Sequence, residues 1–401
     1  MCGRKNRQPG LFYSINLKSL VPANHPLRCI KKLADEELAR LSPKFSAAYS
    51  NIGRPSIPPE ALIKATLLQV LYSIRSERKL CEEIGYNLLF RWFLDLAPDA
   101  PVWDPTTFTQ NRERFASHGL MAAFFDGTVA RGIQKDAVSN EHFSVDGTLV
   151  QSLASLKSFR PKDEDKSDPP PPDANGWADF KGEKRSNQTH ESKTDPEARL
   201  FKKSSGKEAL LYHSVHGLME NRNALLMDIE VTEANGRSER QAAIAMLKRV
   251  KRRHWIKPST LGEDAGYRGA EHAQELEQFG VAQHVASVKG RKPRGWLASQ
   301  RARRGIEKIF GWLKTVGGLK RTRFIERWKT KLYALAAGAT YNLLRLNNLG
   351  LAAQASGQRI KSSARQAPNA APPSPEAKTS RVQLNQRAGT AILAKRFSAA
   401  C

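Results

Sequence analysis

Three acidic residues, far apart in the sequence, stand where carboxylates could do chemistry. Asp146 lies in the middle of HFSVDGTLV, a run of strand-forming residues, and Asp264 ends the short strand predicted within STLGEDAGY. Glu307 is the one acid of the basic helical stretch RGIEKIFGWLK. Asp is disfavoured in strands, so acids at these strand positions need a reason to be there. Carboxylates converging from different elements bind Mg²⁺ well, and pairs of such ions catalyse phosphoryl transfer.

Each acid alone has a simpler interpretation. Asp146 and Asp264 both stand close to a glycine and suit turns, while Glu307 suits an ion pair with Arg303 or another neighbouring cation. Glu263 competes with Asp264 for the second position, but adjacent strand residues face opposite sides of a sheet, so Glu263 is expected to point away. The combination of two strand acids, one helix acid and a strongly basic setting favours the metal-centred interpretation.

The helix around Glu307 has a face suited to phosphates. On a helix that advances about 100° per residue, Arg303, Glu307 and Lys314 fall within about 40° of one another. The adjacent apolar stripe, which should face a sheet, consists of Ile306, Ile309, Phe310 and Leu313. We therefore expect Glu307 at the border of core and solvent, with cations on either side that suit charge-assisted contacts to phosphate.

The elements around these acids predict a mixed α/β sheet flanked by helices. Strands are predicted at 209–220 and 224–234, joined by the turn ENRN, and a helix follows at 238–253. Gly280 should end a further helix, after which 281–288 reads as a strand. The order is strand, long loop, strand, strand, helix, strand, helix, strand, helix.

Residues 1–135 read as an all-helical N-terminal domain. A helix is predicted at 58–74, a second after Ser76 as N-cap, and a third after Asp104 as N-cap with Pro105 following it. Short helices with Arg-rich faces favour a DNA-binding module, and a packing or dimerisation domain is the alternative of equal weight.

Two further segments complete the organisation. The catalytic domain is predicted at 136–350, with an irregular inserted loop at about 153–205 that is rich in Pro, Ser and charge. Residues 351–401 read as a basic, mostly disordered tail that adds nonspecific attraction to phosphates.

The composition favours a polyanionic partner. The 401 residues include 65 Lys and Arg against 39 Asp and Glu, a formal net charge of +26, which is typical of nucleic-acid binding. A membrane span is not expected, because no run of about 18 apolar residues occurs. The four cysteines are far apart and have no metal-binding spacing. We expect a reduced, cytoplasmic protein in which oxygen atoms hold any metal.

These segments together resemble the DDE transposases of bacterial insertion sequences, above all the group of insertion-sequence family five. The resemblance is carried by FSVDGTLV, LGEDAGYRG, RRGIEKIFGWLKTVGGLKRTRF and YNLLRL, and by the N-terminal block RPSIPPEALIKATLLQVLYSI. It extends over most of the chain. It implies an RNase H-like catalytic core and a bacterial protein associated with the nucleoid.

The resemblance also implies roles for individual residues. Asp146, Asp264 and Glu307 correspond to the catalytic, metal-binding triad, which would use Mg²⁺ with Mn²⁺ as a substitute. A family signature consists of Tyr, two residues, Arg, three residues, Glu, six residues and Lys. Arg303, Glu307 and Lys314 fit it, and Gln300 departs from it at the tyrosine position. The basic residues expected on DNA are Arg303, Arg304, Lys314, Lys320, Arg321 and Arg323.

The implied reaction is cleavage at the element's terminal inverted repeats, followed by joining of the freed 3′-hydroxyls to target DNA. The partners would be double-stranded DNA, both repeat and target, and further copies of the chain assembled on it. A metal-dependent nuclease without strand transfer has the same triad. A catalytically silent repeat-binding protein would gain nothing from carboxylates that face phosphates, and a structural RNA-binding protein accounts for the charge but not for the acids.

Overall fold

The computed structural model describes most of the chain before the C-terminal tail. The described residues are 15–50, 52–53, 55–162, 185–202, 206, 208–236, 238–286 and 292–363, with side chains as far as 350. Residues 1–347 form one compact unit by their contacts, and the remainder forms a second. The middle of the predicted inserted loop and the tail from residue 364 therefore lie outside the described residues.

The N-terminal part is helical. Its helices are α1 (Leu17–Leu20), α2 (Pro26–Ala48), α3 (Pro59–Leu71), α4 (Glu77–Tyr86), α5 (Leu88–Leu94), α6 (Thr106–Ser117) and α7 (Leu120–Gln134). The predicted Ser76 cap is present, since its hydroxyl accepts the Lys79 N–H at 3.1 Å. The N-cap of α6 is Pro105 and not Asp104 as predicted, although the Asp104 side chain accepts the Thr106 N–H at 2.8 Å. The predicted second helix is divided at Asn87, whose side chain caps α5.

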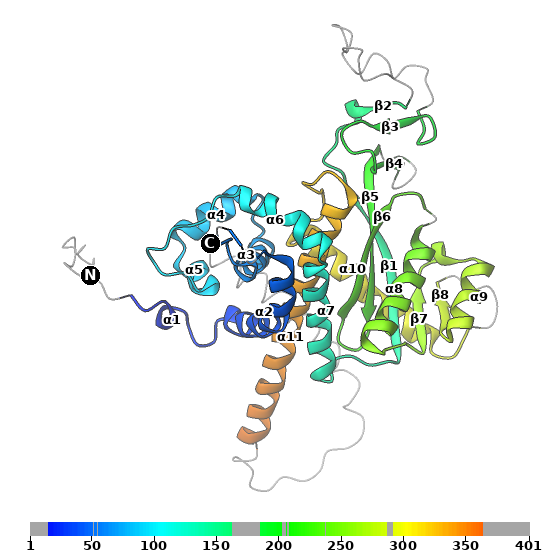
Figure 1. Ribbon diagram of the computed structural model, residues 1–401. Helices are drawn as coiled ribbons and strands as arrows, with labels where there is room; N and C mark the ends of the chain where they lie inside the picture. The colour runs from blue at the N-terminus through cyan, green and yellow to red at the C-terminus, as the bar shows by residue number, and fades with distance from the viewer. Residues whose placement is uncertain are drawn as a thin grey trace, which may run out of the picture. The chain divides into compact units, whose positions relative to one another are not determined.

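A mixed sheet follows, with the strand order β4-β5-β1-β7-β8 and β6 paired to β5 (Figure 1). The strands are β1 (His142–Gln151), β4 (Arg199–Lys202), β5 (Ala209–Glu220), β6 (Leu225–Glu233), β7 (Thr260–Glu263) and β8 (Ala282–Val285). β5 runs antiparallel to both β1 and β6, whereas β7 is parallel to β1 and β8 is parallel to β7. The predicted mixed sheet is confirmed.

The two ends of the predicted inserted loop are ordered, and the expectation of an irregular segment is wrong for them. β2 (Phe159–Pro161) pairs with β3 (His190–Ser192), and β4 joins the main sheet beside β5. A small apolar cluster holds these strands, and its buried members are Ala154, Phe159, Ala198 and Leu211. Strands of three or four residues in a polar segment have too short a pattern to be recognised from sequence.

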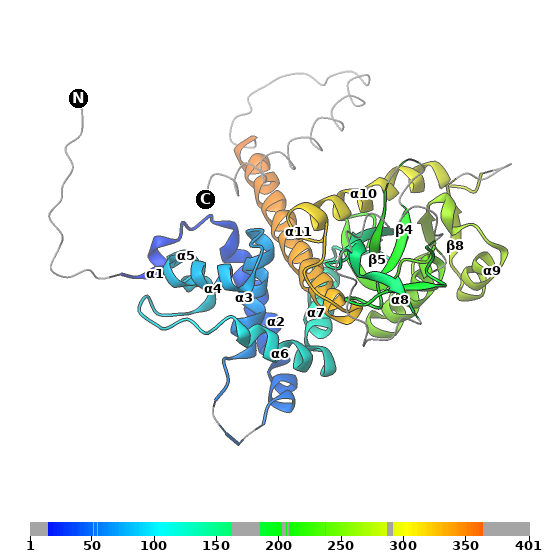
Figure 2. The same cartoon turned by 90° about the horizontal axis from the view of Figure 1, so that it is seen from above.

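Helices cover both faces of the sheet. α8 (Ser238–His254) packs on β5 and β6, and α10 (Trp296–Thr315) packs on β1, β7 and β8. Figure 2 shows these two helices on opposite sides of the strands. α9 (Ala270–Phe279), next to α8 and β8, ends at Gly280 in the left-handed conformation, as predicted.

The remaining long helix is α11 (Arg327–Ser363), which extends beyond the predicted start of the tail. The predicted apolar stripe of α10 is fully or nearly fully buried: Ile306, Ile309, Phe310 and Leu313. None of the helices in the described ranges is long and apolar enough to cross a membrane.

Candidate active site

Asp146 lies near the middle of β1, the central strand, with its side chain only 16% exposed. One carboxylate oxygen accepts the Gly147 N–H at 2.8 Å, and the other accepts from Arg303 at 3.2 Å. Burial raises the pKa of Asp146 to about 6, and the negative charge of Asp264 adds to the increase. A carboxyl group with such a pKa binds a proton or a cation more readily than an ordinary surface aspartate.

Asp264 follows the last residue of β7, the parallel neighbour of β1. The register pairs Ser144 with Gly262, so two residues further along the strands Asp146 and Asp264 come side by side. Asp264 also acts as a turn residue, because its side chain accepts the Gly266 N–H at 2.8 Å. The turn interpretation and the site interpretation of Asp264 are therefore compatible.

Glu263 has a different environment from Asp264. Its buried carboxylate accepts hydrogen bonds from His272 of α9 and Gln283 of β8, both at 2.7 Å. These contacts tie β7 to α9 and β8 and occupy both carboxylate oxygens. Glu263 is accordingly a structural residue, and Asp264 is the acid of β7 left beside Asp146.

Glu307 lies on α10 and is connected to Asp146 through Arg303. The Arg303 guanidinium lies 3.4 Å from a Glu307 carboxylate oxygen and 3.2 Å from Asp146, so it bridges the two acids. The Glu307 side chain is 57% exposed. The ion pair expected for an isolated Glu307 is thus present, and through Arg303 it links Glu307 to Asp146.

The other cations of the predicted DNA-binding set have varied surroundings. Arg304 and Lys320 are exposed, and Lys314 is partly buried. Arg321 donates to the carbonyls of Ser152 and Leu153. Contact of these four side chains with DNA stays a prediction.

Arg323 and Gln300 have structural contacts that the sequence did not indicate. Arg323 donates to the Arg75 carbonyl in the segment between α3 and α4 and lies over the Tyr333 ring, and a DNA contact for it also stays a prediction. Gln300, at the position of the family tyrosine, donates to the carbonyls of Glu263 and His284. It therefore joins α10 to β7 and β8 with the two donor protons of one amide nitrogen, whereas a phenol hydroxyl has a single donor proton.

Glu239, in the first turn of α8, is an acid of the site that the sequence analysis missed. Its carboxylate lies beside Gly147 and Gly266, the glycines next to Asp146 and close after Asp264. Burial raises the pKa of Glu239, and the charge of Asp264 contributes. A glutamate in a helix first turn is ordinary, so its sequence position gave no signal of this placement.

The oxygen donors of this site suit a hard divalent cation. Carboxylate oxygens are the ligands that Mg²⁺ and Mn²⁺ take, and the mutual repulsion of Asp146 and Asp264 is the condition that a cation relieves. Among the described residues, however, no three His, Cys, Asp or Glu side chains stand close enough to hold a metal as they lie. Asp146 and Glu307 are instead paired with Arg303.

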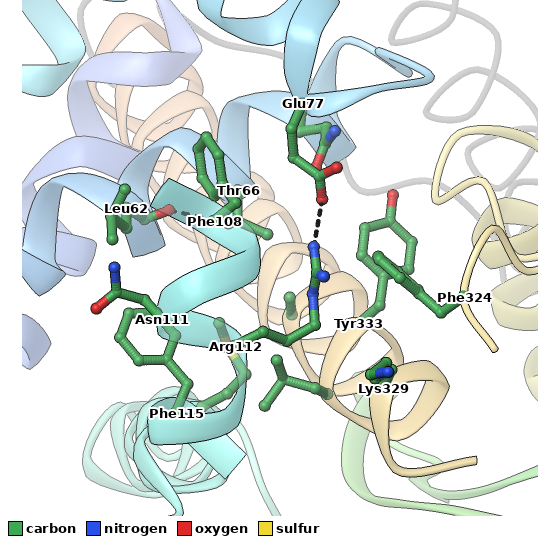
Figure 3. Close-up of a pocket in the computed structure, with 14 residues that line it drawn as sticks. Leu62, Thr66, Glu77, Phe108, Asn111, Arg112, Phe115, Phe324, Lys329 and Tyr333 are labelled. Atoms are coloured by element: carbon green, nitrogen blue, oxygen red, sulfur yellow. Dashed lines mark hydrogen bonds and ion pairs between the residues drawn. The ribbon is translucent and has the colours of Figure 1, made fainter. Parts of the chain in front are cut away.

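A cavity of about 40 Å³ lies elsewhere, between the N-terminal helices and α11 (Figure 3). Arg112 of α6 and Glu77 of α4 form an ion pair of 2.9 Å at its wall, and the Arg112 guanidinium lies 4.6 Å from the centre of the Phe324 ring. The cavity has room for about one water molecule. It marks a joint between these helices.

Comparisons with known proteins identify two segments. Residues 15–114 match the model of a transposase domain (DUF772), and residues 186–343 match the model of a transposase DDE domain. The second segment contains Asp264 and Glu307, whereas Asp146 falls between the two. No match occurs among curated proteins.

Solved structures of other transposases show a distant likeness. A piggyBac transposase synaptic complex with hairpin DNA has 9% identity and a TM-score of 0.38, covering 82% of this chain and 76% of that one. The Mos1 strand transfer complex has 10% identity and a TM-score of 0.24, covering 74% of this chain and 79% of that one. The Mos1 paired-end complex with Mn has 12% identity and a TM-score of 0.19, covering 73% and 88%.

Proposed function

We propose that this DDE transposase of the insertion-sequence type cleaves the terminal inverted repeats of its element and joins the freed 3′-hydroxyls to target DNA. The observation that carries the proposal is the approach of three acids on separate elements. Asp146 and Asp264 lie side by side on parallel strands, and Arg303 links Glu307 to Asp146. We also propose, from the sequence resemblance, that it belongs to insertion-sequence family five.

The acids would hold Mg²⁺, or Mn²⁺ in its place. Asp146, Asp264 and Glu307 supply oxygen donors, and the bound ions would lower the pKa of the attacking water or hydroxyl and stabilise the leaving oxygen. Cleavage and joining are both in-line displacements at phosphorus that differ in the nucleophile. The same carboxylates therefore serve both steps.

The cations beside the acids would hold the DNA backbone. Arg303 already lies between two carboxylates, and phosphate is a chemically similar partner for its guanidinium. With a cation bound by Asp146 and Glu307, Arg303 would be available to contact the scissile phosphate. Lys314, two turns further along α10, would contact the neighbouring phosphate.

Repeat DNA and target DNA are the proposed partners. The net charge of +26 supports binding to a polyanion. Because transposition brings two element ends together, we propose that further copies of the chain assemble on DNA.

Labelled terminal-repeat DNA incubated with Mg²⁺ tests the proposal, with wild type beside Glu307→Gln. We expect the wild type to nick and join, and the variant to lose both activities by about 100-fold or more while still binding the DNA. Glu275→Gln, the same change on the exposed surface of α9, serves as control. Cutting without joining would favour the nuclease, and binding without cutting by the wild type would favour the silent repeat-binding protein.

A further inference from the structure

Glu239 approaches the active site from the face of the sheet opposite to Glu307. It is the second residue of α8, which packs on β5 and β6, whereas Glu307 belongs to α10. One carboxylate oxygen is 3.2 Å from where a Cβ atom on Gly147 would lie, and the other is 3.5 Å from the corresponding position on Gly266. The Glu239 carboxylate thus lies between Gly147, which follows Asp146, and Gly266, in the turn that begins at Asp264.

The two glycines make this approach possible. A Cβ atom at Gly147 would also lie 3.0 Å from the His216 ring, so any side chain there would press on both His216 and Glu239. At Gly266, the same added atom would meet Asp264 at 3.2 Å as well as Glu239. Larger residues at either position would push the Glu239 carboxylate away from the two aspartates.

Helix stabilisation does not account for this position. A glutamate in a first turn interacts favourably with the helix dipole from an exposed place, as Glu271 does in α9. Glu239 is partly buried, and within the described ranges it makes no hydrogen bond or ion pair. The guanidinium of Arg240, the next residue, lies against Gly269 instead. A carboxylate that is partly buried near other carboxylates is costly unless a cation completes the site.

A second observation points to a ligand at the same place. Tyr267, in the turn after Asp264, is fully buried, and its hydroxyl has no hydrogen-bond partner among the described residues. Glu239, Asp146, Glu263 and Asp264 all act electrostatically on this phenol. Buried hydroxyls are normally satisfied, so the Tyr267 hydroxyl is placed to bond a water or a ligand oxygen between the acids.

We propose that Glu239 is a fourth metal-binding carboxylate of this active site, which holds a divalent cation together with Asp264 and Asp146 from the α8 face. The proposal rests on the proposed function. Glu307 would act from the α10 face, so the two glutamates would flank the middle of β1 and the end of β7 from opposite sides. Tyr267 is a positioning residue that orients a water of the cation through its hydroxyl.

Binding of Mn²⁺ to the full-length protein without DNA, followed by electron paramagnetic resonance, tests the proposal. We expect Glu239→Gln to weaken Mn²⁺ binding by about 10-fold or more, or to remove one bound ion. Glu271→Gln makes the same change at the same position of α9 and should bind Mn²⁺ as the wild type does. Equal binding by the two variants would overturn the role of Glu239.

Two further variants separate this proposal from the proposed function. Asp264→Asn should abolish Mn²⁺ binding, and if it binds Mn²⁺ normally the metal site itself is wrong. If Asp264→Asn loses the ion and Glu239→Gln keeps it, only the role of Glu239 fails. Glu239→Asp retains the charge but shortens the reach, so it should also weaken binding, and thermal unfolding confirms that each variant is folded.

Discussion

Arg303 makes the metal-free site electrostatically tolerable. Its guanidinium compensates Asp146 and Glu307 at once. Asp264 and Glu239 lie close enough to each other for the charge of Asp264 to raise the pKa of Glu239. Such a site is destabilising by itself, because buried like charges repel and lose hydration. A bound cation would relieve this repulsion, so the same arrangement that destabilises the metal-free protein favours cation binding.

Removing the charge of Asp146 should therefore stabilise the metal-free protein. The folded-state pKa of about 6 lies above the ordinary value of 3.8. The ionised form thus costs stability above pH 6, and the cost disappears as pH falls through 6 toward 4. We expect Asp146→Asn to raise the free energy of unfolding at pH 8 by roughly 1–3 kcal/mol, with the gain vanishing near pH 4, while DNA cleavage is lost.

Thermal unfolding from pH 4 to pH 8 measures this effect. Asp136→Asn is the control, because the Asp136 side chain is 95% exposed and asparagine suits its positive φ of 51°. A lower unfolding temperature for Asp146→Asn at pH 8 would contradict the interpretation.

The role of a single residue could be predicted only where its neighbours in the sequence made it unusual. Asp146 and Asp264 were noticeable because acids in strand patterns are unusual, and the parallel pairing of β1 and β7 brings them together. The contacts of Glu239, Arg321 and Arg323 had no such signal. They depend on which surfaces α8 and the segment before α11 meet in the folded chain, and a one-dimensional pattern does not contain that information.

At the scale of elements, the joint beside the small cavity connects the N-terminal helices to the segment that precedes α11. Arg112 is 12% exposed and Glu77 23%, and Arg323 crosses the same joint to the Arg75 carbonyl. Ion pairs of this kind are damaged most when one partner is removed, because the remaining charge stays buried and unpaired.

We expect Arg112→Met to lower the free energy of unfolding by roughly 1–3 kcal/mol, since Glu77 loses its partner. Lys79→Met is the matched control: it also removes a cation, but Lys79 pairs with Glu82 at 3.3 Å where both side chains are about half exposed, and such pairs contribute little. Urea unfolding distinguishes the two variants. Equal midpoints for both would show that the joint is not stabilised by this pair.

Regular elements were predictable where the periodic pattern was long. The β5–β6 hairpin, α8, α9 and α10 follow from apolar spacing and from caps and turns that are local in sequence. β4 was not predictable, because it is a four-residue strand whose stability comes from pairing with β5 and from the apolar cluster beneath it. Whether such a short strand forms is determined by pairing with a strand distant in sequence, and less by its own β propensity.

At the scale of the whole molecule, positive charge is spread far beyond the active site. The net charge of +26 already counts every acid of the catalytic centre as ionised. Nonspecific attraction to the phosphate backbone should therefore involve regions remote from the acids. The C-terminal tail, whose side chains lie outside the described residues, contains several of these cations.

Replacing Lys378, Arg381, Arg387, Lys395 and Arg396 with Gln should weaken nonspecific DNA binding and reduce its dependence on salt. Each cation that neutralises a phosphate contributes about 0.9 to the magnitude of the slope of log affinity against log salt, so this magnitude should fall by up to about 4.5. Titration of a duplex of unrelated sequence at several salt concentrations measures the slope. The same five positions with Lys and Arg exchanged keep the charge and should keep the slope. If the Gln variant also keeps it, the tail does not contact DNA, and the nonspecific attraction comes from the folded unit alone.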